Sequence, residues 1–182
     1  TVPGFNPASV GQTVNKWIVA ETVSAAQIIT AYITTYHFND AAGAAYHFVY
    51  DYFCDWYIEF TKPIFQTGAD DAKRETRATT AWARDQILKL LHPFMPFITE
   101  ELWAKTAETP RETLLLVAPW DDFDGFAEDI AASTEITWLI DLIKGIRSRR
   151  AEMNVPAGAK IPLVLNGASD ESAARLGKHI DV

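Results

Sequence analysis

The stretch AAGAAYHFVYDYFCDWYIEF, residues 41–60, decides the fold. Its apolar residues recur at spacings of three and four, which places them on one face of an α-helix. The residues on this face are Ala41, Ala42, Ala45, Phe48, Val49, Tyr52, Phe53, Trp56 and Phe60. The spacing predicts a long amphipathic helix. We expect Asn39 to cap its start and Pro63 to end it.

Further helices are predicted on both sides of this stretch. Apolar spacing predicts helices over about 17–33, 71–91, 96–105 and 127–152. The third of these begins with Pro96, which suits the first turn of a helix. Around it we expect a buried knot of apolar side chains, made by Phe94, Phe97, Leu102 and Trp103.

The C-terminal part has a mixed pattern. Residues 113–118 (TLLLVA) predict a strand or a buried extended stretch, and residues 160–165 (KIPLVL) predict an edge strand that contains Pro162. A last helix is predicted over 170–180. The fold is therefore expected to be mainly α, a bundle of about five helices with a short C-terminal α/β segment.

Three regions are expected along the chain. Residues 1–13 read as an N-terminal loop, residues 14–152 as the helical bundle, and residues 153–182 as the start of a small α/β segment. Because the chain begins at Thr1 and ends within a predicted helix, we expect it to be part of a longer protein.

Composition limits the classes of function. The chain has 182 residues, 48% hydrophobic, and a formal net charge of −8. No apolar run is long enough for a membrane span. We expect no signal peptide, and the single Cys54 predicts a reduced, cytoplasmic protein. Free-standing nucleic-acid binders are usually basic, so RNA binding would require a local basic patch.

No catalytic or metal-binding pattern is present in the sequence. The four histidines are not spaced for metal ligation, and no phosphate-binding loop or nucleophile motif occurs. The adjacent Glu100 and Glu101 point in different directions on a helix, so they do not make an acid/base pair. We therefore expect a chain that binds rather than catalyses, without a metal or cofactor of its own.

Two basic clusters stand out against the acidic background. Lys73, Arg74 and Arg77 open one predicted helix, with Arg84 further along it. The other cluster is Lys144, Arg147 and Arg150 at positions i, i+3 and i+6, with Arg149 beside them. Each cluster is either a solvated helix face or a contact for phosphates.

The aromatic residues of 46–60 exceed what one buried stripe requires. Phe48, Phe53 and Phe60 are expected to pack in the core. For Tyr50 and Tyr57 we weigh packing against stacking on unpaired bases.

Three motifs carry a resemblance to a known family. Residues 90–103 (LLHPFMPFITEELW) resemble a helix junction of the class I aminoacyl-tRNA synthetases for valine, isoleucine and leucine. Residues 38–42 (FNDAA) followed by 53–57 (FCDWY) resemble the anticodon-binding bundle of the valine enzymes. Residues 150–156 (RAEMNVP) resemble the stretch just after that bundle.

The resemblance implies a tRNA anticodon-binding helical domain. Its partners would be the anticodon stem-loop of a valine tRNA and the rest of a synthetase chain, with no membrane and no DNA. The parent enzyme would use ATP and magnesium, but the adenylate-forming signatures and the editing domain are absent here, so this chain alone is expected to be inactive. His37 stands before Phe38, where a basic residue is expected.

The resemblance and the charge pattern together give the candidate residues for tRNA binding. They are Lys73, Arg74, Arg77, Arg84, Tyr57, His37, Asn39, Lys144, Arg147 and Arg150. The alternative hypothesis is a helical protein-interaction or structural module, which the acidic charge and the aromatic excess also fit. A small helical enzyme is a third hypothesis, and the lack of an acid/base or metal pattern disfavours it.

Overall fold

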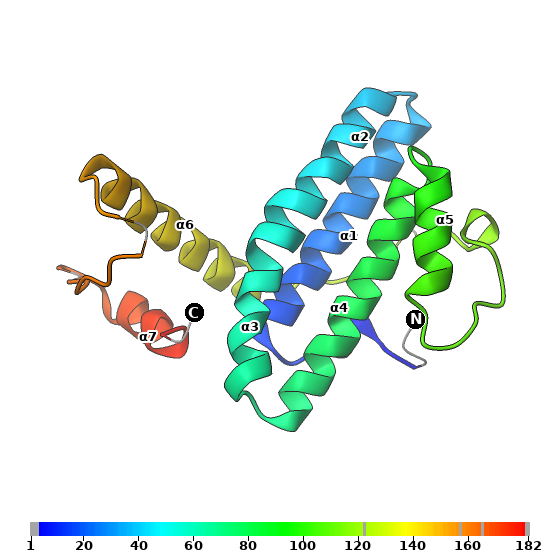
Figure 1. Ribbon diagram of the computed structural model, residues 1–182. Coiled ribbons are helices and arrows are strands. Elements are labelled where there is room, and N and C mark those ends of the chain that lie inside the picture. The colour runs from blue at the N-terminus through cyan, green and yellow to red at the C-terminus, as the bar shows by residue number, and fades with distance from the viewer. Residues whose placement is uncertain (1–3, 122, 157, 165, 181–182) are drawn as a thin grey trace.

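The computed structural model describes residues 4–121, 123–156, 158–164 and 166–180. It is mainly helical, as predicted (Figure 1). The α-helices are α1 (Thr13–Thr34), α2 (Phe38–His47), α3 (Ile58–Thr67), α4 (Asp70–Leu91), α5 (Pro96–Lys105), α6 (Ile130–Glu152) and α7 (Asp170–Lys178). The π-helix η2 (Phe48–Tyr57) joins α2 to α3, and the short 3-10 turns are η1 (Pro7–Ser9) and η3 (Leu115–Val117).

Helix α1 lies at the centre of the bundle. It packs against α2, η2, α4 and α6, so its side chains are buried around most of its circumference. Trp17, Ile18 and Ile29 are fully buried, and they join side chains of η2, α3, α4 and α6 in the main hydrophobic core. Burial on several sides fits the spread of apolar residues around α1, which are not confined to one narrow stripe.

Helices α2, η2 and α3 form one continuous helical rod beside α1 (Figure 1). The residues at both junctions keep right-handed helical backbone angles. The prediction that Pro63 ends this helix is wrong, because α3 continues past it to Thr67. A proline removes one backbone donor. Here the buried Phe60 and the half-buried Ile64 pack in the core on either side of Pro63 and hold the helix together.

A tight turn at Gly68 connects α3 to α4. A Cβ atom on Gly68 would lie 2.5 Å from the carbonyl oxygen of Ile64, so only glycine fits this close approach. The helix predicted over 71–91 is confirmed as α4. Its apolar side chains are buried as expected, with Trp82, Ile87 and Leu90 each at most 7% exposed.

Helix α5 packs against α4 and begins with Pro96 as predicted. The predicted apolar knot is only partly correct. Trp103 is buried against Leu88 and Leu115, and Phe94 is half-buried. Phe97, however, is 92% exposed and Leu102 is 38% exposed, because α5 has only one of its faces against α4.

The C-terminal part lies beside the main bundle. Helix α6 begins at Ile130, three residues later than predicted, because the side chain of Asp129 caps it by accepting from the backbone N–H of Ala132 at 3.0 Å. It crosses α1 and then projects outward, and α7 lies next to it (Figure 1).

Neither predicted strand is found in the described part of the chain. Residues 115–117 of the first segment form η3, in which only Leu115 is buried. Residues 160–164 of the second segment have no regular structure, and Leu165 lies outside the described residues. Backbone groups form a strand only when another strand is available to pair with them.

A buried ion cluster fastens the segment after α5 to α4. Asp85 of α4 is only 2% exposed, and its Oδ1 atom accepts hydrogen bonds from Arg84 and Arg111, each at 2.9 Å. The Arg111 guanidinium also stacks 3.7 Å above the ring of Trp103. Burial alone would raise the pKa of Asp85, but the hydrogen bonds from Arg111 and Arg84 outweigh it and lower that pKa.

We expect Asp85→Asn to reduce the free energy of unfolding by about 3 kcal/mol near neutral pH, because it leaves the largely buried guanidinium group of Arg111 without its counter-charge. A lowered pKa means that the carboxylate stabilises the fold above its unfolded pKa, and that this stability is lost as the pH falls through the folded value. Urea unfolding of both proteins at about pH 7 and about pH 3 should show a smaller difference at the acidic pH. An equal difference at both values would contradict this account.

Candidate nucleic-acid interface

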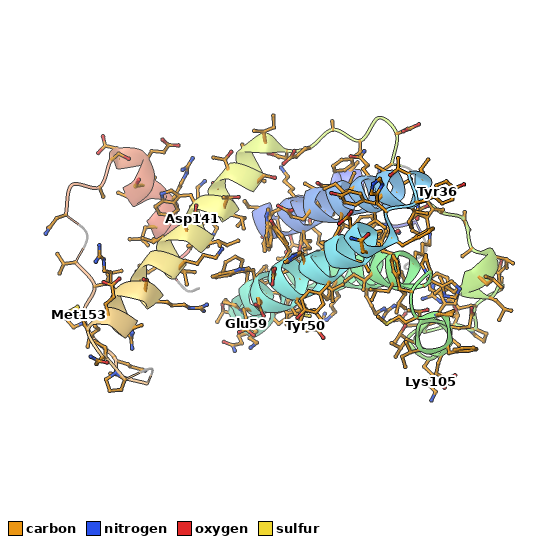
Figure 2. The ribbon with its side chains drawn as sticks, turned by 90° about the horizontal axis from the view of Figure 1, so that it is seen from above. Tyr36, Tyr50, Glu59, Lys105, Asp141 and Met153 are labelled. Carbon is orange, nitrogen blue, oxygen red and sulfur yellow. The ribbon has the colours of Figure 1, made fainter. Side chains whose placement is uncertain are left out.

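The predicted binding residues lie in three separate places. His37 and Asn39 are at the turn between α1 and α2, whereas Lys73 lies in the first turn of α4, at the opposite end of the bundle (Figure 1). Lys144 and Arg147 are on α6, which leaves the bundle sideways (Figure 2). The structure therefore does not bring all the predicted residues together.

The α1–α2 turn presents aromatic rings to solvent. Tyr36 is 81% exposed, has a positive φ of 60°, and meets Phe38 edge-on at 6.1 Å between ring centroids. His37 is exposed, and its Nδ1 atom lies 2.9 Å from the hydroxyl of Thr35. Asn39 is also exposed, but it is not the predicted cap: α2 already begins at Phe38, and the Asn39 side chain donates to Asp40 instead.

The basic cluster of α4 is split between free and structural cations. Among the described residues, Lys73, Arg74 and Arg77 form no ion pair, and the last two are exposed. The guanidinium group of Arg77 lies 5.6 Å from the ring centroid of Phe65. Arg84, by contrast, forms an ion pair with the buried Asp85. Its predicted contact with a phosphate would compete with this ion pair.

Tyr57 does not fit its predicted stacking role. Its side chain is fully buried, and its hydroxyl group donates to Oδ1 of Asn15 at 3.0 Å and lies 3.1 Å from the hydroxyl of Thr80. Burial raises the pKa of Tyr57. A ring in this position cannot meet a base from solution, so Tyr57 is a core residue.

Arg150 supports the chain after α6. One of its terminal nitrogens donates to the backbone carbonyl oxygens of Pro156 and Ala159, each at 2.9 Å. The motif at residues 150–156 therefore has a structural use in holding this turn. A phosphate contact by Arg150 would have to share the same guanidinium group.

A cleft between η2 and α6 was not predicted from the sequence. It has a volume of about 570 Å³. One wall comes from α1 and from the rod of α2, η2 and α3, and the other wall comes from α6. The residues that the rod contributes are His47, Asp51, Tyr52, Asp55 and Trp56. Figure 2 shows Asp141 on the α6 side.

The π-helical geometry of η2 aligns the first wall. In a π-helix each backbone bond closes on the fifth residue rather than the fourth, so the turn is wider. Residues four and five apart, such as Asp51, Asp55 and Trp56, then share one face. In an α-helix Asp51 and Asp55, which are four residues apart, would also share a face, whereas Trp56, five residues after Asp51, would be turned further away from it.

Two cations border this cleft without a counter-ion. The Nζ atom of Lys144 lies 5.9 Å and the guanidinium carbon of Arg147 lies 5.2 Å from the ring centroid of Trp56. Neither forms an ion pair with any described carboxylate, although Asp55 and Asp141 line the same cleft. A cation held over an indole keeps its N–H groups available for another acceptor.

The floor of the cleft is less accessible. Trp17 is fully buried there, and its indole N–H donates to Glu21 at 3.0 Å. Burial raises the pKa of Glu21. Tyr52 is 39% exposed, with its ring 6.3 Å from that of Trp17, so it offers a partly open aromatic surface inside the cleft.

A stacked pair of tyrosines continues along the rod outside the cleft. The rings of Tyr46 and Tyr50 lie 4.4 Å apart at an angle of 27°, and both are more than half exposed. A stacking role for Tyr50 therefore stays an open prediction. On the same rod, the Nδ1 atom of His47 lies within hydrogen-bond distance of Oδ2 of Asp51, at 2.7 Å.

Two other kinds of site are missing from the part of the chain that the structure describes. No group of three or more histidine, cysteine or carboxylate side chains there is arranged to hold a metal ion. No helix among the described residues combines the length and apolar character needed to cross a bilayer.

Comparison with known proteins gives a consistent result. The family described as the anticodon-binding domain of tRNA ligase matches residues 15–165. The chain is 52% identical over 183 residues to a valine–tRNA ligase of Caulobacter vibrioides and 51% identical over 179 residues to that of Brucella suis. These alignments cover 100% and 97% of this chain, but only 20% of each relative, so the chain spans about one fifth of their length.

We expect Tyr57→Phe to lower the free energy of unfolding by about 1–2 kcal/mol, because it removes the hydroxyl partner of the buried Asn15. Tyr50→Phe is the matched control, since that ring is 52% exposed and should lose little stability. Urea unfolding of the two variants measures the difference. Equal stability of both would argue against the buried hydrogen bond.

Proposed function

The chain belongs to the family of anticodon-binding domains of tRNA ligases, and from this premise we propose that it binds the anticodon stem-loop of a transfer RNA. The family match carries this proposal, because residues 15–165 include nearly every element from α1 to α6. The relatives named as valine–tRNA ligases favour a valine tRNA as the ligand.

We further propose that the chain acts as one part of a longer, cytoplasmic valine–tRNA ligase. Joining valine to tRNA with ATP and magnesium would then be carried out by other parts of that enzyme. This chain would supply RNA recognition, and the rest of the synthetase would be its second partner.

The surface chemistry supports RNA binding despite the acidic composition. Lys73, Arg74 and Arg77 at the start of α4, and Lys144 and Arg147 on α6, are cations without ion pairs among the described residues. Such groups exchange bound counter-ions for phosphates. The exposed rings of the α1–α2 turn and the Tyr46–Tyr50 pair suit the stacking of unpaired bases.

A protein-interaction role is the second candidate, and one observation favours it. Exposed apolar side chains gather on α5 and η3, where Phe97 is 92%, Leu116 71% and Val117 66% exposed. Apolar side chains gathered in this way mark contact surfaces. In the proposed enzyme the same surface would face the rest of the synthetase chain, so the two roles are compatible.

We expect Lys144→Ala/Arg147→Ala to weaken the binding of valine tRNA. The plot of log affinity against log salt concentration should become shallower by about 1.4, because each cation that no longer neutralises a phosphate of a single strand reduces the magnitude of the slope by roughly 0.7. Arg74→Ala/Arg77→Ala tests the α4 cluster separately. Filter binding across a salt titration measures both variants.

Arg149→Ala is the matched control, because Arg149 is on the same helix but is 80% exposed and paired with Glu152. This variant should keep the wild-type affinity and slope. Equal retention of valine tRNA and unrelated tRNAs by the wild-type chain would reject the proposed function and favour the interaction module.

A further inference from the structure

We propose that the cleft between η2 and α6 holds one unpaired nucleotide, with its phosphate on Lys144 and Arg147 and an amino group of its base on Asp51 and Asp55. This inference rests on the proposed function and makes it more specific. It assigns to the cleft a preference for bases that carry an exocyclic amino group.

The size of the cleft fits this ligand. Pockets that hold small organic molecules have volumes of about 300–1,000 Å³, and this cleft measures about 570 Å³. Its two walls belong to different parts of the chain, the rod and α6, so a base entering between them would be enclosed from two sides.

The cations stand where a phosphate can reach them from solvent. Lys144 and Arg147 are exposed, while Trp17 at the floor is fully buried. Both cations lie over the ring of Trp56, which orients them without neutralising them. A phosphate at the mouth of the cleft would gain two charge-assisted hydrogen bonds.

The carboxylates give the cleft its selectivity. Asp55 is exposed and forms no hydrogen bond or ion pair with a described residue, and Asp51 bonds to His47 through one oxygen only. An ionised carboxylate accepts hydrogen bonds but cannot donate them. It therefore favours the N4 amino group of cytosine and opposes the O4 carbonyl of uracil, which has the same ring shape.

An aromatic surface completes the site. The ring of Tyr52 is 39% exposed and lies on the same face of η2 as the two aspartates. Stacking on such a ring accepts any base. The stacking would hold the base in the cleft, and the carboxylates would decide which base is held.

The test compares short oligocytidylate and oligouridylate of equal length, which differ at the 4-position of the base. Fluorescence anisotropy with the wild-type chain should show tighter binding of oligocytidylate by roughly tenfold. In Asp51→Asn/Asp55→Asn this preference should disappear, because an amide can donate to uracil O4 as well as accept from cytosine N4.

Two further variants complete the experiment. Glu101→Gln neutralises an exposed carboxylate that is paired with Lys105 on α5. Figure 2 shows Lys105 far from Asp141, which lines the cleft, so this variant should keep the preference. Lys144→Ala/Arg147→Ala should weaken the binding of both oligonucleotides by the same factor. Circular dichroism and thermal unfolding confirm that each variant is folded.

Three results would overturn the inference: no binding of either oligonucleotide by the wild type, no preference between them, or a preference that survives in Asp51→Asn/Asp55→Asn. If valine tRNA is still retained specifically in any of these cases, only the cleft assignment fails. If the wild-type chain does not retain valine tRNA over other tRNAs, the proposed function itself fails.

Discussion

The bundle depends on one buried amide, the side chain of Asn15. Its Nδ2 atom donates to Glu75 at 2.8 Å and to Thr76 at 3.1 Å, both on α4, and its Oδ1 atom accepts from Tyr57 at the end of η2. Glu75 in turn accepts from the backbone N–H groups that precede α1. A fully buried amide needs these partners, so α1, η2 and α4 can meet in only one rotational setting.

That setting decides which face of η2 reaches the cleft. With Tyr57 turned inward to Asn15, the π-helical turn directs Asp51, Tyr52 and Asp55 toward α6. Helix η2 therefore makes the interior hydrogen bond from one side and presents the proposed binding face on another side. A change in the core at Asn15 would be felt at the cleft, although the side chain of Asn15 does not line it.

Much of the fold could be predicted because the helices carry local signals. Apolar spacing predicted α1, α4 and α6, and Pro96 marked the start of α5. The misses came from information that is distant in the sequence. Asn15, which accepts the hydrogen bond from the buried hydroxyl of Tyr57, is 42 residues away in the sequence. Apolar spacing also cannot distinguish the exposed Phe97 from a core residue. The cleft was missed because it joins two helices that are far apart in the sequence.

The acidic net charge is a poor guide to the field that an RNA would meet. Many carboxylates serve the fold: Glu75 and Glu100 accept from backbone N–H groups, Asp129 caps α6 and pairs with Lys16, and Asp85 pairs with Arg84 and Arg111. Asp129 and Asp85 are each balanced by neighbouring cations, and the contribution of surface charges at a distance is screened by salt. The unpaired cations on α4 and α6 are not balanced in the same way. A chain with more acidic than basic residues can therefore still present positive surfaces to phosphates, provided that its carboxylates are occupied within the fold.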